Sequence, residues 1–283
     1  MRLIITVRIS LPRIILLPDN HNLNENRRIF MMDFKDKTVF ITGASSGIGA
    51  ACARMFAAHG ARLILSARRV ERVRSLAAAL PAATHVMQLD VRDQKQVQKK
   101  IDTLPAGWSA IDLLLNNAGL ARGLSRLHEG DLNDWQEMID TNVKGLLYVT
   151  RAIVPGMIAR NNGHIINIGS IAGHEVYPFG NVYCATKHAV DALTRGLRLD
   201  LSGTPLRVST VDPGLVETEF SLVRFHGDKQ RAQNVYQGMQ SLTAEDIADA
   251  VFYCASRPAH VQIAEIIILP TAQRSATVVD RKM

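Results

Sequence analysis

Tyr183 and Lys187 are the two residues whose types and spacing most directly suggest chemistry. Four residues apart on a helix, they share one face, so a phenol and an ammonium can lie close together. A free phenol has a pKa of about 10, and a nearby cation favours its ionised form, which brings proton transfer closer to neutral pH. The pair can therefore act as a general acid and base. The same spacing also arises by chance on a solvated helix face, so the interpretation depends on the rest of the chain.

An alternation of strands and helices is predicted to position this pair. Strands that are apolar throughout indicate a sheet covered on both faces, and the strand segments here have that pattern. The pattern predicts one α/β domain over residues 33–270, a doubly wound, Rossmann-type parallel sheet of about seven strands with helices on both faces. We expect strands at 38–42, 62–67, 84–89, 111–115, 164–168, 207–211 and 266–269, and helices from the 43–49 turn to 59 and at 70–80, 94–104, 134–154, 182–201 and 244–256.

The two ends of the chain differ from this core. In residues 1–32, prolines and arginines interrupt every apolar run, which argues against a membrane span and against a secretory signal. We expect this extension to be a disordered tail or the product of an upstream start assignment, with an organelle presequence as the alternative. For the tail at 271–283, a loose end and a contact with a neighbouring subunit both remain open.

Charge and cysteine content exclude several classes of function. Most of the formal charge of +7 lies in the two ends, so the domain has no strong nucleic-acid footprint. Cys52, Cys184 and Cys254 are too scattered for a disulfide framework, which favours a reducing compartment, and we expect a cytoplasmic protein. Cys184 has no activating partner in the sequence and is expected to be a packed residue. The histidines have no ligand spacing, so no metal is expected.

The segment between the first strand and the first helix is rich in glycine. Glycines let a strand turn sharply into a helix and let the backbone approach a pyrophosphate, which the helix N-terminus then faces. A plain tight turn is the alternative, but the position is the one that dinucleotide binding requires. The expected contacts come from Gly43, Ala44, Ser45, Ser46, Gly47, Ile48 and Gly49.

The end of the second strand indicates which dinucleotide is bound. An acidic residue there would hydrogen-bond the ribose 2′-hydroxyl of NAD, whereas this sequence has Arg68 and Arg69. Two guanidinium groups suit the 2′-phosphate of NADP. The alternative is a solvated basic helix start, although arginines at a helix N-terminus oppose the helix dipole.

Polar residues follow several other strands at the same edge of the sheet. Asp90 and Val91 follow the third strand, and Asp90 could accept from an adenine amino group. Asn117 follows the fourth strand, where an asparagine can also serve only to form a turn. After the sixth strand, Pro213 and Gly214 would place backbone groups against the nicotinamide carboxamide, with Val216 and Thr218 close by.

Taken together, these motifs resemble the set found in classical short-chain dehydrogenases/reductases. The resemblance covers about residues 37–270 and rests on Thr42-Gly43-x-x-x-Gly47-x-Gly49, Asn116-Asn117-Ala118-Gly119, Asn142, Ser170, Tyr183-x-x-x-Lys187 and Pro213-Gly214. It implies a catalytic tetrad. Tyr183 would be the acid and base, and Lys187 would lower its pKa and bind the nicotinamide ribose. Ser170 would hold the substrate oxygen, and Asn142 would position a helix and a water.

A finer resemblance concerns the substrate. The segments 116–121, 134–142, 163–170 and 218–225 look like those of NADP-dependent 3-hydroxy acid dehydrogenases that also act on serine and allo-threonine. This implies oxidation of a short 3-hydroxy acid, or reduction of the matching semialdehyde, by a homotetramer. A substrate carboxylate calls for a cation, and we expect Arg224, with His226 or Arg122 as second choices. The alternative for Arg224 is a surface arginine.

Two other functions remain open. One is another NADPH-dependent carbonyl or 3-oxoacyl-thioester reductase of the same superfamily, which would reduce bulky ketones and ignore short hydroxy acids. The other is a binding module that senses NADP without turnover, although such a module has no need for Tyr183 and Lys187 together. Fold alone does not separate these functions.

Overall fold

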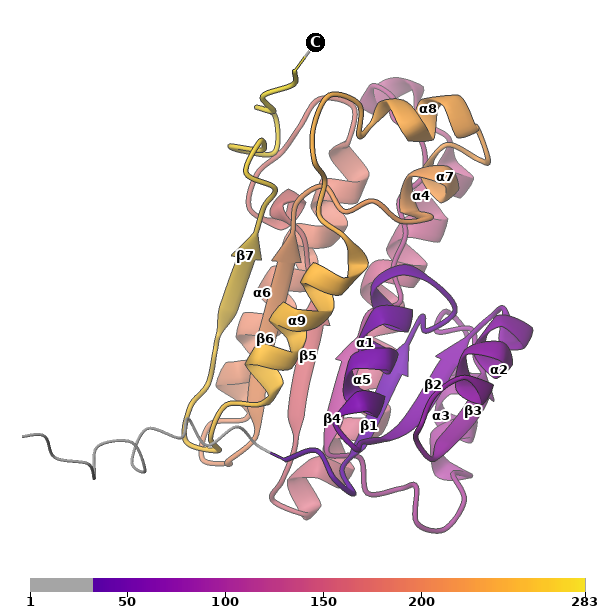
Figure 1. The fold of residues 1–283 in the computed structure, drawn as a ribbon, viewed down its shortest axis with the longest axis vertical. Helices are drawn as coiled ribbons and strands as arrows, with labels where there is room; N and C mark the ends of the chain where they lie inside the picture. The colour runs from indigo at the N-terminus through magenta and orange to yellow at the C-terminus, as the bar shows by residue number, and fades with distance from the viewer. Residues whose placement is uncertain (1–32, 283) are drawn as a thin grey trace, which may run out of the picture. The chain divides into compact units, whose positions relative to one another are not determined.

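The computed structural model describes residues 33–282, so the predicted 1–32 extension lies outside the described residues. Seven parallel strands form one sheet in the order β3-β2-β1-β4-β5-β6-β7 (Figure 1). The order reverses between β1 and β4, and in such sheets ligands bind at the carboxyl ends of the strands beside this point. The predicted doubly wound α/β sheet is confirmed. The strands are β1 Thr38–Thr42, β2 Arg62–Ala67, β3 Thr84–Gln88, β4 Leu113–Asn116, β5 His164–Ile168, β6 Arg207–Pro213 and β7 Glu265–Ile268.

Helices cover both faces of the sheet, with α1 and α9 packed together on one face and α3, α5 and α6 on the other (Figure 1). Within residues 33–282, no helix combines the length and the apolar character that crossing a bilayer requires. The helices are α1 Gly47–Ala58, α2 Val70–Ala78, α3 Gln94–Asp102, α4 Leu132–Ile139, α5 Leu146–Ala159, α6 Asn181–Asp200, α7 Phe220–Arg224, α8 Lys229–Asn234 and α9 Ala244–Ala255, with 3₁₀ turns at Leu127–Glu129 and Ile171–Gly173.

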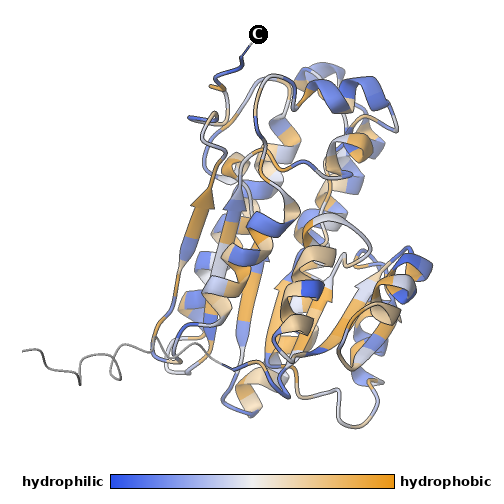
Figure 2. Ribbon diagram, viewed as in Figure 1, coloured by the Kyte–Doolittle hydropathy of each residue, from blue (hydrophilic) through white to orange (hydrophobic). Residues whose placement is uncertain are grey.

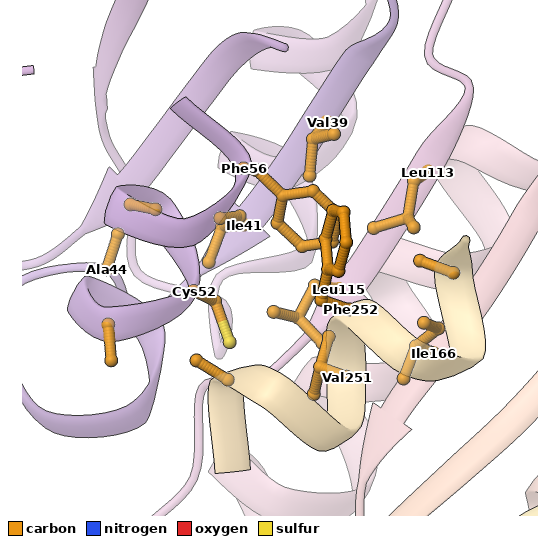
Figure 3. Packing of buried hydrophobic residues seen from close by; sticks show 14 of the residues in the cluster. Val39, Ile41, Ala44, Cys52, Phe56, Leu113, Leu115, Ile166, Val251 and Phe252 are labelled. Carbon is orange, nitrogen blue, oxygen red and sulfur yellow. The ribbon is translucent and has the colours of Figure 1, made fainter. Parts of the chain in front are cut away.

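An aromatic cluster joins α1 to α9 and fixes the first strand beneath them. The ring of Phe56 on α1 packs against that of Phe252 on α9 (Figure 3). Their centroids are 5.7 Å apart, and Phe34 packs against both rings. Burying one such ring contributes about 1.5–3 kcal/mol. The cluster therefore anchors α1, whose N-terminus faces the predicted dinucleotide site.

Strand β6 is more polar than its neighbours. Figure 2 shows hydrophobic strands in the centre of the sheet, whereas β6 is largely hydrophilic. Ser209, Thr210 and Asp212 are nonetheless buried in it, so their polar atoms need internal partners. Thr210 donates to Asp212 at 2.7 Å, and His174 lies 3.1 Å from the other carboxylate oxygen. The last residue of this polar strand is Pro213, one of the predicted site residues.

The helix predicted over 134–154 is present as one helical run from 132 to 159, but a π-helical turn at Asp140–Gly145, which was not predicted, separates α4 from α5. Asn142 lies in this turn, with its side chain bound to the loop after β4. π turns inside helices are rare and occur mostly at functional sites. Asparagine is unfavourable inside an α-helix because its side chain competes for backbone hydrogen bonds, and here it lies in the turn where the helix widens.

The C-terminal tail packs against its own chain and is not a loose end. Gln273 is only 5% exposed, and its side-chain oxygen accepts from the backbone N–H of Leu215 at 2.8 Å. Further along, the N–H of Lys282 donates to the carbonyl of Gly238 at 2.8 Å. The tail thus lies over the segment that follows β6.

Candidate active site

A cavity of about 710 Å³ opens at the carboxyl ends of the strands. Most of the predicted site residues line it, from the glycine turn, the ends of β2, β3 and β5, helix α6 and the segment after β6. Ala44, Gly49 and Asn142 are not in its lining, and act from behind it. The predicted residues that line the cavity are Gly43, Ser45, Ser46, Gly47, Ile48, Arg68, Arg69, Asp90, Val91, Asn117, Ser170, Tyr183, Lys187, Pro213, Gly214, Val216, Thr218 and Arg224.

The glycine turn is held by Asn117. Its side-chain amide donates to the carbonyls of Thr42 at 2.8 Å and Gly43 at 3.2 Å. Gly43 has a φ of +68°, and a Cβ on Gly49 would come within 2.5 Å of the Asn117 amide nitrogen. Both glycines are therefore required, one by conformation and the other by close approach. Asn117 supports the turn from below, which is the structural role that the sequence left open for it.

The N-terminus of α1 is suited to an anion. Ser46 occupies the cap position, and among the described residues no side chain caps this helix end. Its first N–H groups consequently remain free, and they carry the positive end of the helix dipole. A dinucleotide pyrophosphate is the expected ligand of such an end.

Arg68 and Arg69 both line the cavity after β2. Arg69 donates to the hydroxyls of Ser45 at 3.2 Å and Ser46 at 2.8 Å, and forms an ion pair with Glu219 at 2.8 Å. Arg68 is half exposed and 3.3 Å from Glu137. Two guanidinium groups thus border the cavity, and such groups can bind a phosphate.

Asp90 is engaged by a neighbouring arginine. The guanidinium of Arg92 contacts both carboxylate oxygens of Asp90, the shortest contact being 2.6 Å. Burial disfavours ionisation of Asp90, but the hydrogen bonds from Arg92 outweigh it and its pKa is lowered. Asp90 is therefore an ionised acceptor. Val91 beside it packs against Gly145 of the π turn, where a Cβ would come within 2.6 Å.

Tyr183 lies on α6 with its side chain in the cavity wall, only 8% exposed. Burial raises its pKa, aided by Tyr177, while the charge of Arg224 and a hydrogen bond with Ser170 oppose the rise. We predicted that Lys187 lowers this pKa, and in this arrangement the net shift is in the opposite direction. The physical reason is that removing the phenol from water disfavours the phenolate more than the neighbouring charges favour it.

Lys187 is buried one turn further along α6. Its ammonium donates to the carbonyl of Ile168, at the end of β5, at 2.8 Å and lies 5.9 Å from the Tyr183 ring centroid. Burial lowers the pKa of Lys187 to about 8, against the negative charge of Asp212. The ammonium is fixed by the strand end and still reaches the cavity.

Ser170 follows β5 and caps the 3₁₀ turn Ile171–Gly173. Its hydroxyl accepts from the N–H of Ala172 at 3.1 Å and donates to the carbonyl of Pro213 at 3.3 Å. The donor contact is long and its acceptor is a strand-end carbonyl, so a substrate oxygen can compete for this hydrogen. The serine is thus fixed between the two strand ends that border the reaction space.

Asn142 connects three elements from behind the cavity. Its amide donates to the carbonyl of Leu120 at 2.8 Å and to the hydroxyl of Thr186 at 3.1 Å, and its oxygen accepts from the N–H of Leu120 at 2.9 Å. Thr186 precedes Lys187. The contacts therefore fix the π turn and the loop after β4 to the part of α6 that carries the tyrosine and the lysine.

Arg224 enters the cavity from the end of α7. Its guanidinium carbon is 5.0 Å from the Tyr183 ring centroid and 5.5 Å from that of Phe220, and an Nη donates to the Tyr177 hydroxyl. Its Nε is buried and has no partner among residues 33–282. A buried, unpaired donor is costly, so a shift of the side chain that gave this nitrogen an anionic partner would be favourable.

The two second choices for the substrate cation are less suited. Arg122 lines the cavity but is bound to Glu137 at 2.7 Å and to the carbonyl of Val223 at 2.6 Å. His226 is exposed and lies 3.0 Å from Asp134. Both side chains therefore serve contacts within the protein.

Sequence reasoning missed Tyr177, which orients Arg224. Gly180 makes room for its ring, since a Cβ there would overlap it, and the intervening Phe179 adopts a φ of +65° that a bulky residue rarely tolerates. The tail was also missed as part of the site, because Gln273 and Arg281 line the cavity. Gly180 was the one indication in the sequence of space for the Tyr177 ring, and it does not indicate that Tyr177 contacts Arg224.

The cysteines are poor nucleophiles. All three are free and buried, and burial raises the pKa of each thiol, that of Cys254 to about 12. Thiolate chemistry requires a lowered pKa. Cys184 is consequently a packing residue beside the tyrosine, as predicted from the sequence.

Residues 37–228 match the family model of the short chain dehydrogenases. The chain belongs to this family. Among curated short-chain dehydrogenases, it is 47% identical over 239 residues to the NADP-dependent 3-hydroxy acid dehydrogenase of Shigella flexneri, covering 84% of this chain and 96% of that protein. It is 45% identical over 251 residues to the protein of the same name from Schizosaccharomyces pombe, covering 87% and 97%.

Solved structures agree with this placement. A serine dehydrogenase in its closed form with NADP+ superposes with a TM-score of 0.83 at 45% identity, covering 87% of this chain and 100% of that one. The serine dehydrogenase of Escherichia coli superposes with a TM-score of 0.74 at 42% identity, covering 83% and 99%. As a short-chain dehydrogenase, this chain is an oxidoreductase, and the free N–H groups at the uncapped end of α1 fit a dinucleotide.

Proposed function

We propose that this short-chain dehydrogenase transfers a hydride between NADP and the 3-hydroxyl carbon of a short 3-hydroxy acid of the serine, allo-threonine and 3-hydroxypropionate class. The observation that carries the proposal is the position of Arg224, a partly buried cation whose guanidinium carbon lies 5.0 Å from the ring centroid of Tyr183. A group that binds a carboxylate beside the proton-transferring phenol selects hydroxy acids over neutral alcohols. The names of the relatives support the same substrate class and cofactor.

The four tetrad residues have distinct tasks in this reaction. The chemistry that a bound NADP would supply is hydride exchange with the substrate carbon. Tyr183 exchanges the hydroxyl proton, and Ser170 donates to the substrate oxygen. Lys187 keeps a positive charge next to the phenol, and Asn142 holds the helix that carries both. The protein thus supplies alignment and a proton path.

The substrate carboxylate would bind Arg224, with the Tyr177 hydroxyl holding the guanidinium in place. A carboxylate on this guanidinium lies in the same cavity wall as the phenol, so the hydroxyl-bearing carbon is presented to Tyr183. Serine oxidised in this way gives aminomalonate semialdehyde, which loses carbon dioxide without a further catalytic residue.

A cofactor-dependent absorbance assay tests the proposal. Purified protein is mixed with L-serine, L-allo-threonine and 3-hydroxypropionate, first with NADP and then with NAD, and reduced nicotinamide is followed. We expect NADP reduction by the wild type and a loss of about 10²–10⁴-fold in kcat for Tyr183→Phe, with NADPH binding retained. Reduction of bulky ketones without turnover of these acids would establish the carbonyl reductase alternative. NADPH binding without any turnover would establish the sensor.

We propose further that the enzyme is a cytoplasmic homotetramer that binds neither nucleic acid nor membrane. Support for assembly comes from exposed apolar side chains on the outer helices and the edge strand, at Leu147, Leu199, Tyr253 and Ile267. Uncovered β7 is an edge that another copy can cover. Light scattering coupled to size exclusion measures the mass, and a monomer at micromolar concentration would contradict the tetramer.

A further inference from the structure

Glu219 joins two walls of the cavity. It precedes α7, on the segment that follows β6, and its two carboxylate oxygens contact Arg69 at 2.8 Å and Arg72 at 2.6 Å. Both arginines come from the segment after β2. The carboxylate therefore links the predicted 2′-phosphate site to the segment that carries the substrate cation.

The other contacts of Arg69 show which side of its guanidinium group the Glu219 carboxylate occupies. Nε and Nη2 are bound to the hydroxyls of Ser45 and Ser46 on the glycine turn, and Nη1 is bound to Glu219. The hydroxyl contacts fix the plane of the guanidinium against the N-terminus of α1. The carboxylate holds the remaining side, which is the side available to another anion.

Carboxylates and phosphates are alternative ligands of the same guanidinium fork. Glu219 is ionised at neutral pH, because the hydrogen bond from Arg72 and then that from Arg69 lower its pKa. Both Arg69 and Glu219 line the cavity. An arriving 2′-phosphate would therefore meet an occupied arginine and a negative charge.

We propose that Glu219 is a cofactor-selectivity residue, whose carboxylate competes with the 2′-phosphate of NADP for Arg69. Release of Glu219 by the phosphate frees the start of α7, so NADP and not NAD loosens the segment that ends in Arg224. This inference rests on the proposed use of NADP. According to this proposal, the binding of NADP must displace the contact between Glu219 and Arg69.

Binding measurements test the inference without turnover. Dissociation constants for NADPH and NADH are measured by fluorescence for the wild type, Glu219→Gln and Glu217→Gln. Glu217 is a matched control, two residues away and hydrogen-bonded to Ser241 outside this arginine pair. We expect Glu219→Gln to bind NADPH roughly two- to tenfold more tightly, the size expected for two exposed ion pairs, and NADH unchanged. Glu217→Gln should alter neither constant.

Two further measurements locate the effect. Adenosine 2′,5′-bisphosphate, titrated against AMP by calorimetry, should show the same gain in Glu219→Gln, because it carries the 2′-phosphate without nicotinamide. In an Arg69→Gln background, Glu219→Gln should no longer strengthen NADPH binding, since the shared partner is gone.

The inference is overturned by weaker or unchanged NADPH binding in Glu219→Gln, or by an equal change for both cofactors. An equal loss would mean that Glu219 closes over either cofactor. If the wild type did not prefer NADPH to NADH, that result would contradict the proposed use of NADP and not the role of Glu219. The NADH constant also reports whether each variant retains its fold.

Discussion

The guanidinium carbon of Arg224 lies 5.0 Å from the ring centroid of Tyr183. The two residues come from α7 and α6, so the end of one helix places a cation over the phenol that another helix carries. This relationship joins substrate recognition to proton transfer, since the same guanidinium that can bind a carboxylate also favours the phenolate.

Replacing Arg224 with methionine should raise the KM for serine and 3-hydroxypropionate by about 10- to 100-fold, because a charged hydrogen bond contributes about 1.5–3 kcal/mol. Steady-state kinetics with these acids and with a neutral alcohol of similar size measures the effect. Arg231→Met is the matched control, since Arg231 stacks on Phe225 at 4.4 Å on the neighbouring helix and does not line the cavity. An unchanged KM for the acids would remove Arg224 from the site.

The raised pKa of Tyr183 predicts a difference between the two directions of the reaction. Reduction needs the protonated phenol, which is the dominant form at neutral pH, whereas oxidation needs its conjugate base. We therefore expect hydroxy acid oxidation to accelerate as pH rises above 7 and semialdehyde reduction to be fastest near or below neutral. Initial rates in both directions across a pH series measure this. Parallel profiles would show that another group controls proton transfer.

Burial of Lys187 should destabilise the fold at neutral pH. Its pKa falls from 10.5 to about 8 on folding, so the unfolded chain binds more protons between these values and the free energy of unfolding rises with pH there. Below pH 8 the full cost of the buried charge is present, and above 10.5 it is gone. Lys187→Met should consequently gain on the order of 1–2 kcal/mol at pH 7, after loss of its hydrogen bond to Ile168.

Urea titrations of the wild type and Lys187→Met at pH 7 and pH 10 measure this difference. The advantage of the variant should shrink at the higher pH, while hydride transfer is impaired at both. A variant that is less stable at pH 7 than the wild type would mean that the carbonyl contact outweighs the buried charge.

Two glycines within helices should respond in opposite ways to alanine. In Gly49→Ala the new methyl would lie 2.5 Å from the Asn117 nitrogen and 2.6 Å from the carbonyl of Gly43, so the cofactor turn must shift. We expect a lower melting temperature and weaker NADPH binding. In Gly196→Ala, on α6, nothing lies within 4 Å of the new methyl, and helix propensity should add about 0.5–1 kcal/mol. Calorimetry on both variants checks the contrast, and equal shifts would contradict it.

The sheet and the glycine turn could be predicted because their determinants are local. Short apolar runs such as Leu113–Leu115, alternating with helical segments, indicate strands covered on both faces, and the turn carries its glycines where backbone conformation demands them. The π turn at Asp140–Gly145 could not be predicted in the same way, because it depends on Asn142 bonding to a loop far away in sequence. Asparagine is unfavourable inside an α-helix, but this preference does not by itself indicate a π turn.

The electrostatics of the site were harder to predict from the sequence than the sheet and the glycine turn. The sequence places Lys187 one turn from Tyr183, but not the depth at which the phenol is buried, and that depth determines its pKa. The Arg224 contact with Tyr177 spans 47 positions of the chain. Contacts between residues so far apart in sequence depend on tertiary packing alone. The residue types therefore suggest a role for each residue but do not identify the residue that it contacts.

The cavity wall that contains Gln273 and Arg281 comes from residues that follow β7 in the chain. Every strand and every helix that supports the site precedes this wall in the chain. The sheet and the glycine turn are therefore complete without this wall, which closes the reaction space on one side.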